Sequence, residues 1–385
     1  MYSSFVTNVF PHAMFHLMIP VVAVFLLFLC SCESESSSVN VYVTSEEDDI
    51  GTTNCNESPS VTCSLRSAWN TCNNLVENSD GETNVCSIYM PSFASISFNG
   101  SDPLEITHNY PVQMTVYGNG SAVTGHSNQL ISYTSTSDLY QNVSLMGFSL
   151  ISFGSATING GVIYAKGLTN LELFNMTLSG NEGLSGGSLY LDGISGSGVS
   201  SLRIQDCVFE HDRSYGNYPD GGGSIYVQSM KSGSVNIIKS NFSGTSSEYG
   251  GSIYLYSSDS TSIEQCNFTG TSSEEGGSVY IFENNFASFE RCTFIGNTAS
   301  SGGGIYVDGG EGDTLVNRCS FYGNKATLNF GGGVAMISKT MTVTNSNFSQ
   351  NTAIAAGGGI YALKSSDLSI ISAYMNENEA LKGGG

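Results

Sequence analysis

Only a few side chains in this sequence could carry catalytic chemistry, because charged residues make up 12% of its 385 residues. Acid–base cleavage of a polymer, or cleavage assisted by calcium, needs carboxylates held close together and a basic group near them. Asp206 stands between Gln205 and Cys207 without a second carboxylate, and His126 has no acidic motif nearby. We therefore assign no catalytic residue from the sequence.

Two acidic segments could bind calcium, which prefers oxygen ligands. One is "DGGEGD", from Asp308 to Asp313, and the other is the run from Glu46 to Asp49. The first segment lacks the regular spacing of a calcium loop, so a solvated hairpin is the favoured interpretation and calcium is the alternative. No other cofactor is expected.

Tyrosine is the best candidate for a functional residue, because it recurs at one position of a repeated phrase. That position holds Tyr164, Tyr190, Tyr226, Tyr254, Tyr280, Tyr306 and Tyr361. Rings that stack along a fold would present a flat strip able to hold a sugar or a protein partner, with Tyr226, Tyr254, Tyr280 and Tyr306 as the central candidates. The alternative is that the rings stack on one another and only stabilise a sheet.

A repeat indicates which elements would hold these tyrosines. Phrases such as "GGSIYV" and "GGGIYV" recur, mostly 26 to 29 residues apart, and a phrase such as "CTFIGN" recurs at a matching interval. A fixed period of this length predicts a solenoid. The repeat contains short β-rich runs between Gly, Ser and Asn turns and no helical period, so we predict an all-β fold, a right-handed parallel β-helix. The glycine phrase starts at Gly160, Gly186, Gly222, Gly250, Gly276, Gly302, Gly331, Gly357 and Gly383, and the aromatic position of the second phrase holds Phe209, Phe242, Phe268, Phe294, Phe321 and Phe348.

The geometry of a β-helix explains the residue types. Adjacent rungs lie ~4.8 Å apart, so equivalent side chains form ladders along the axis. Alternation along "GGSIYV" turns Ile225 and Val227 inward and Tyr226 outward, and along "CTFI" it turns Cys292 and Phe294 inward. Glycine is expected at the corners, where it adopts a positive φ freely. The asparagines at one turn position are expected to stack their amides: Asn181, Asn297, Asn324, Asn351 and Asn378.

Cysteines fall into two groups after residue 32. Cys55, Cys63, Cys72 and Cys86 crowd one short segment. We expect two disulfides among them; three pairings are open, and Cys72 with Cys86 is slightly preferred because it would join a helix to the strand "CSIYM". The cysteines of the repeat are Cys207, Cys266, Cys292 and Cys319. Parallel side chains on adjacent rungs suit the disulfide dihedral angle poorly, so these thiols are predicted to stay reduced and buried.

The start of the chain predicts export. Residues 1–32 are interpreted as a signal peptide, because the apolar stretch Met18–Leu29 is too short to span a bilayer. An uncleaved anchor is the alternative. We expect a secreted or cell-surface protein, possessing sequons for N-glycosylation at Asn56, Asn99, Asn119, Asn142, Asn175, Asn241, Asn267 and Asn347.

The rest of the chain is predicted to form a cap and a solenoid. Residues 33–95 would be an N-terminal cap with a short amphipathic helix, in which Leu65 and Trp69 share one face. Residues 96–385 would be the β-helix, with regular repeats from about residue 160. The chain stops at "KGGG" inside a repeat, so we expect it to be truncated, with any membrane anchor beyond residue 385.

The charge of the chain excludes one class of partner. Its formal net charge is −21, and it has only 12 Lys and Arg residues together. Nucleic-acid binding depends on clustered basic side chains, so we predict no nucleic-acid partner. An extracellular glycan or protein ligand remains the expected partner.

The repeated phrases also resemble a known family. "F-x-x-N", as in Phe294 to Asn297, followed by "G-G-x-[ILV]" resembles the repeat of the chlamydial polymorphic outer membrane proteins over roughly residues 160–385. This resemblance implies an exported β-helical passenger region that acts in adhesion. Two departures are that Ser or Gly replaces the usual Ala after the glycine pair and that no membrane barrel follows. "CSLRSAW", from Cys63 to Trp69, resembles the CSLREA motif at the start of some secreted β-helices.

We therefore expect a surface adhesion or structural binding module. The alternative is a polysaccharide-active enzyme of the pectin-lyase-like type, a lyase or a glycoside hydrolase. Assays of binding and turnover on polysaccharides would separate the two.

Overall fold

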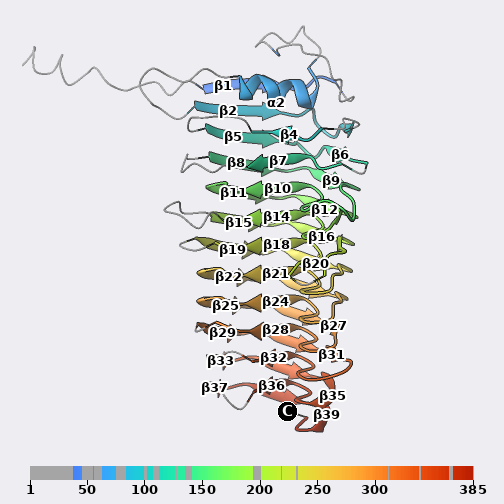
Figure 1. Ribbon diagram of the computed structural model, residues 1–385, viewed down its shortest axis with the longest axis vertical. Coiled ribbons are helices and arrows are strands. Elements are labelled where there is room, and N and C mark those ends of the chain that lie inside the picture. The colour runs from blue at the N-terminus through green and yellow to red at the C-terminus, as the bar shows by residue number, and fades with distance from the viewer. Residues whose placement is uncertain are drawn as a thin grey trace, which may run out of the picture. The chain divides into compact units, whose positions relative to one another are not determined.

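Three long parallel sheets run side by side through Ser38–Gly385, and each turn of the chain adds one strand to each sheet (Figure 1). The computed structural model describes residues 38–45, 55, 63–74, 84–98, 102–106, 112–126, 128–134, 141–193, 201–217, 219–230, 233–310, 312–337, 340–363 and 367–384. The predicted signal peptide and the acidic run Glu46–Asp49 lie outside these residues. The predicted parallel β-helix is confirmed.

The first sheet has 12 strands, and every neighbouring pair is parallel and in register. Its strands are β1 (Ser38–Tyr42), β2 (Asn84–Tyr89), β5 (Val112–Tyr117), β8 (Gln141–Met146), β11 (Asn170–Phe174), β15 (Ser201–Gln205), β19 (Ser234–Ile238), β22 (Ser260–Glu264), β25 (Phe286–Glu290), β29 (Asp313–Asn317), β33 (Thr340–Thr344) and β37 (Asp367–Ile371). Two of these strands, β1 and β2, fall within the segment predicted as the cap, so the sheet begins before the expected boundary at residue 96.

The second sheet follows the first along each turn of the chain and has 11 short strands. They are β3 (Ser95–Ser97), β6 (Ala122–Thr124), β9 (Ser149–Ile151), β12 (Thr177–Ser179), β16 (Val208–Glu210), β20 (Asn241–Ser243), β23 (Asn267–Thr269), β26 (Thr293–Ile295), β30 (Ser320–Tyr322), β34 (Asn347–Ser349) and β38 (Tyr374–Asn376).

The third sheet has 10 strands, and from β10 onward each of them follows a glycine pair. They are β4 (Leu104–Glu105), β7 (Ile131–Thr134), β10 (Ile163–Lys166), β14 (Leu189–Asp192), β18 (Ile225–Gln228), β21 (Ile253–Tyr256), β24 (Val279–Phe282), β28 (Ile305–Asp308), β32 (Val334–Met336) and β36 (Ile360–Ala362). Short strands between the second and third sheets are β13 (Glu182–Gly183), β17 (Arg213–Ser214), β27 (Thr298–Ala299), β31 (Lys325–Ala326), β35 (Thr352–Ala356) and β39 (Glu379–Lys382).

Ladders of identical side chains fill the interior between the sheets. Ile225 and Val227 of β18 are fully buried, as the alternation predicts. The phenylalanines of the second sheet stack from Phe209 to Phe348 with ring centroids 4.5 to 4.9 Å apart, so each ring packs on the ring of the next rung. The predicted inward positions of Cys292 and Phe294 are confirmed, and all four cysteines of the repeat are free and buried.

Two kinds of corner shape each turn. The first glycine of each pair has a positive φ; at Gly186, with φ 63°, an added Cβ would lie 1.9 Å from the carbonyl oxygen of Leu189, so no other residue fits. Between the first and second sheets a single left-handed residue makes the bend, and here the side chain points away from the core. Arg291 and Arg318, both with φ 53°, occupy this position.

The predicted asparagine ladder stabilises another corner. Asn297 donates its side-chain amide to Asn324 Oδ1 at 2.9 Å, and Asn324 donates in the same way to Asn351 Oδ1 at 2.9 Å. Each amide also donates to a backbone carbonyl of the preceding rung, as Asn297 does to Phe268 O at 3.1 Å. In one rung the position belongs to Asp212, which accepts from the backbone N–H of Asn181 at 3.0 Å.

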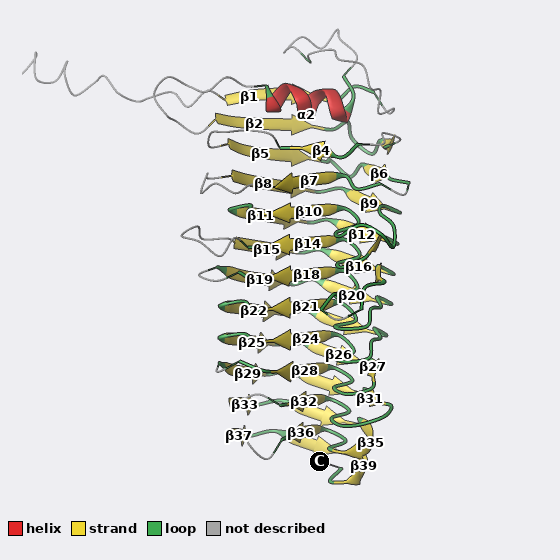
Figure 2. Ribbon diagram, in the orientation of Figure 1, coloured by secondary structure: helices red, strands yellow, loops and turns green. Residues whose placement is uncertain are grey.

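A short helix lies at the N-terminal end of the stack. It is α2 (Leu65–Asn73), the single helix within the described ranges, and it lies beside β1 (Figure 2). Ser64 caps its first turn by accepting from Ser67 N at 3.1 Å. Trp69 is fully buried and donates its indole N–H to Glu105 O at 2.8 Å. The helix therefore covers the apolar end of the first rungs, as the sequence predicts.

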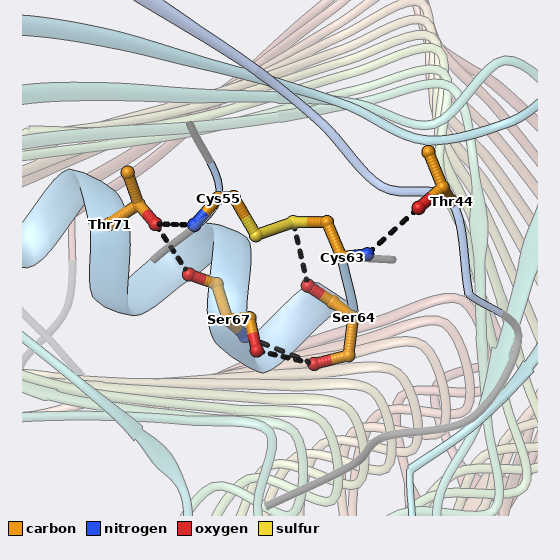
Figure 3. Close-up of a disulfide and its surroundings, with 6 residues drawn as sticks. All are labelled: Thr44, Cys55, Cys63, Ser64, Ser67 and Thr71. Carbon is orange, nitrogen blue, oxygen red and sulfur yellow. Dashed lines mark hydrogen bonds between the residues drawn. A yellow bond between two sulfur atoms is a disulfide. The ribbon is translucent and has the colours of Figure 1, made fainter. Parts of the chain in front are cut away.

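Both predicted disulfides are present in this cap. Cys72 of α2 is bonded to Cys86 of β2, the preferred pairing, and Cys55 is bonded to Cys63. Around the second bond, Cys55 N donates to Thr71 Oγ1 at 3.0 Å and Cys63 N donates to Thr44 Oγ1 at 2.8 Å (Figure 3). No helix in the part of the chain that the structure describes is long and apolar enough to cross a membrane.

Candidate functional site

The tyrosines predicted to form a binding strip are not available to a ligand. Tyr226, Tyr254, Tyr280 and Tyr306 leave the third sheet on the side away from the core, in register, yet they are only 1%, 0%, 2% and 5% exposed. They form a second buried cluster together with Tyr190. The prediction of an accessible strip at these four positions is therefore wrong.

Neighbouring side chains cover the rings. The ring of Tyr249, from the turn before a glycine pair, lies 6.2 Å from that of Tyr254 and 5.5 Å from that of Tyr280. Tyr226 donates its hydroxyl hydrogen to Pro219 O at 3.1 Å or to Gln228 Oε1 at 3.0 Å. Burial raises the pKa of Tyr226 and Tyr280, so these phenols stay neutral. Stabilisation of the sheet, the alternative stated above, is the role that this packing supports.

A different row of large side chains is exposed on the outer face of the first sheet. It consists of the last residues of five consecutive strands, which we call the exposed row: Tyr42, Tyr89, Tyr117, Met146 and Phe174. Tyr42 is 55% exposed and Phe174 is 42% exposed, and the three between them are half-buried. The ring of Tyr89 stacks on those of Tyr42 and Tyr117 with centroids 5.2 and 4.9 Å apart. The row therefore presents the edges of stacked rings along a line that crosses β1, β2, β5, β8 and β11, which lie next to one another in the first sheet (Figure 1).

A polar groove runs beside the exposed row. One hollow of about 390 Å³ is lined by Gln113, Asn142, Ser144, Asn170, Glu172, Ser201, Arg203 and Asn236. A second hollow of about 410 Å³ is lined by Met146, Glu172, Leu173, Phe174, Arg203 and Gln205. The hollows share Glu172 and Arg203, so we treat them as one site, the first-sheet groove, with Met146 and Phe174 common to the groove and the exposed row.

Hydrogen bonds hold the polar groups of the groove in place. Ser144 donates to Glu172 Oε2 at 3.2 Å, and Asn170 donates to Asn142 Oδ1 at 2.6 Å. Arg203 donates from Nη2 to Gln205 Oε1 at 2.8 Å.

The charges of the groove lie side by side. Glu172 and Arg203 are register partners on β11 and β15, so a negative and a positive group occupy adjacent rungs. The groove thus offers fixed amides, hydroxyls and one pair of opposite charges next to apolar rings.

Sequence reasoning missed this site for an identifiable reason. Four of the five strands of the exposed row lie before residue 160, where the glycine phrase is absent and the register between strands cannot be read. A usable signal was the tyrosine that ends "VNVY", "CSIY" and "MTVY", at Tyr42, Tyr89 and Tyr117. Those three residues share one slot of the first sheet.

Calcium remains a prediction without structural support. Asp308 ends β28 and Asp313 begins β29, and burial raises the pKa of Asp308. Among the residues described, no group of three or more His, Cys, Asp or Glu side chains has a geometry that could hold a metal ion.

A match to a family model supports the fold. Residues 225–379 match the family model described as "Right handed beta helix region". No curated protein matches the chain. The chain is similar in structure to a protein described as "Geobacillus virus E2 - ORF18", with 12% identity and a TM-score of 0.47, over 94% of this chain and 63% of that chain. The resemblances to polymorphic outer membrane proteins and to the CSLREA motif remain predictions.

Proposed function

We propose that this protein is a glycan-binding module that acts in adhesion or in surface structure and holds its ligand on the outer face of the first sheet. The observation that carries this proposal is the exposed row lying beside the first-sheet groove. Aromatic side chains with a few fixed polar groups next to them are the usual composition of a ligand site.

The chemistry of the two surfaces suits a sugar. The exposed edges of the stacked Tyr89 and Tyr117 rings, together with the ring of Phe174, offer apolar surface to the C–H groups of a sugar. The amides of Asn142 and Asn170 and the charged groups beside them can pair with sugar hydroxyls, which both donate and accept hydrogen bonds. A protein ligand would use the same rings but would not need so many amides in a shallow groove.

Export to the cell surface is part of the proposal. Two disulfides in the cap fit an oxidising compartment. The sequon asparagines Asn241, Asn267 and Asn347 are exposed at the starts of β20, β23 and β34, where they could be glycosylated. An adhesion role of the polymorphic-membrane-protein type is consistent with these features.

The alternative is a polysaccharide-active enzyme acting in the same groove. Hydrolysis of a glycosidic bond commonly uses two carboxyl groups about 5 to 10 Å apart. Among the described lining residues Glu172 is the one carboxylate, next to Arg203. Binding without turnover is therefore the function that the site supports best.

The test is sedimentation of the protein with a panel of insoluble polysaccharides, combined with measurement of released sugar. The variant Tyr117→Ala/Phe174→Ala removes two aromatic rings from the exposed row. The control is Tyr322→Ala, because Tyr322 is 47% exposed on β30 of the second sheet. We expect the wild-type protein and the control to bind and the double variant to lose at least tenfold in affinity. Equal binding by the folded double variant would refute the site, and sugar release would favour the enzyme.

A further inference from the structure

We infer that the first-sheet groove and the exposed row together take an uncharged glycan chain that lies along the axis of the β-helix. This inference rests on the proposed function, and it adds the direction, length and charge class of the ligand. Three observations carry it: the direction in which the row extends, the place where the row ends, and the charge balance of the groove.

The direction follows from the strand register. The five residues of the exposed row come from consecutive strands, β1, β2, β5, β8 and β11. Four steps of ~4.8 Å between rungs give a row ~19 Å long, perpendicular to the strands. The polar lining extends in the same direction, from Gln113 on β5 to Asn236 on β19. A ligand that contacts both surfaces must therefore cross the strands and span several sugar units.

The row of large side chains ends at Phe174. The register partner of Phe174 on the next strand is Gln205, which binds Arg203. Ile238 follows in this slot, and Glu264 and Glu290 come after it on β22 and β25. These carboxylates pair with corner arginines: Glu264 with Arg291 at 3.3 Å and Glu290 with Arg318 at 3.5 Å. Ion pairs therefore occupy this slot on β22 and β25, and the unbroken run of large exposed side chains lies at the N-terminal end of the sheet.

The charge of the site disfavours acidic glycans. Arg203 is the one cation among the described lining residues, and Glu172 occupies the adjacent rung. A polyuronate would bring one carboxylate per sugar, of which a single guanidinium could pair with one. The remaining carboxylates would meet a chain with a formal net charge of −21, which repels anions over a distance of about a Debye length. An uncharged glycan is not subject to this electrostatic repulsion.

The experiment is calorimetric titration of the full protein with three oligosaccharide series, each from the dimer to the octamer. Cello-oligosaccharides and chito-oligosaccharides are uncharged, and oligogalacturonates carry a carboxylate on each sugar. We expect the Kd of at least one uncharged series to fall with each added sugar and to level off once the chain spans the row. At low salt, the Kd of the oligogalacturonates should be at least tenfold higher than that of the uncharged series that binds. This difference in Kd should become smaller at high salt.

Variants make the outcome specific to the site. Glu172→Gln should reduce the difference in Kd between the oligogalacturonates and the uncharged oligosaccharides, because it removes the negative group beside Arg203. Affinity that does not depend on length, tighter binding of the oligogalacturonates, or no binding of either uncharged series would overturn the inference. If oligogalacturonates bind best and Tyr117→Ala/Phe174→Ala abolishes that binding, the proposed function stands and only this inference fails.

Discussion

Replacing Asp212 by asparagine should stabilise the protein at and above neutral pH. Asp212 takes the place of an asparagine in the corner ladder and is fully buried. Its carboxylate accepts from Ser188 Oγ at 2.6 Å and from Asn181 N at 3.0 Å. Burial raises the pKa of Asp212 from 3.8 to about 7, and these hydrogen bonds oppose the rise only in part.

The size of the effect follows from this shift. A raised pKa means that the folded protein binds the proton more tightly than the unfolded chain does. The contribution of protonated Asp212 to the free energy of unfolding is therefore complete below a pH of about 4. It declines as the pH rises toward about 7 and is absent above that value. At ~1.4 kcal/mol per pKa unit, the shift corresponds to ~4 kcal/mol lost across this range.

An asparagine at this position has no proton to lose, so it should remove the pH dependence. Its carbonyl oxygen can keep the hydrogen bond from Asn181 N. Its amide can donate to the hydroxyl of Ser188, which can accept as well as donate. Asn324 and Asn351 already fill equivalent positions in other rungs with their amides paired. The fold therefore accommodates the substitution without a change of volume.

The assay is chemical unfolding at a series of pH values, followed by hydrogen exchange to locate the change. Asp212→Asn should match the wild-type protein near pH 4 and exceed its free energy of unfolding by ~4 kcal/mol near pH 8. Asp313→Asn is the control, because Asp313 is exposed. If the advantage of Asp212→Asn over the wild-type protein is the same at both pH values, the buried carboxylate does not titrate as argued.

Three further predictions follow from the packing. Phe294→Ala should cost about 3–5 kcal/mol, since it opens a hole in a stacked ladder, and unchanged hydrogen exchange in the neighbouring rungs would contradict the role given to this ring. Tyr280→Ser should lower the melting temperature without weakening glycan binding by the folded protein, because Tyr280 is buried; a selective loss of binding would restore it as a site residue. The thiol of Cys292 should react with a maleimide slowly in the native protein and quickly after denaturation without reductant, and a stoichiometric disulfide from Cys292 to Cys266 or Cys319 in mass spectra would show this expectation to be wrong.

The solenoid could be predicted because the same pattern, a glycine pair followed by a short strand of alternating side chains, recurs many times in the sequence. Alternation turned Ile225 and Phe294 inward correctly, and the glycine phrase placed the corners. Alternation also placed Tyr226 on the outer side of its strand. The alternating pattern does not show whether side chains from other segments cover an outward residue. For Tyr280, part of the cover comes from Tyr249, which lies in a turn of the preceding rung and is distant in sequence.

The site escaped prediction for a related reason. The exposed row depends on the register between strands such as β2 and β5, whose loops differ in length and carry no repeated phrase. Asp212 was missed for another reason: it stands three residues after Phe209, as in the F-x-x-N phrase, but an aspartate replaces the asparagine. For the exposed row, the missing information was which residues stack, and only the pairing of the backbones supplies it.

The asparagine ladder has a direction. The side-chain nitrogens of Asn297, Asn324 and Asn351 each donate to the amide oxygen of the next rung, and Thr271 donates its hydroxyl to the first of these oxygens, on Asn297, at 2.9 Å. Turning one amide around would set two oxygens face to face on one side and two nitrogens on the other, so a single reversal is forbidden unless its neighbours reverse as well. The side-chain amides of this corner are therefore all oriented in the same direction along the axis of the β-helix. Their common orientation is therefore a property of the whole ladder and not of any single rung.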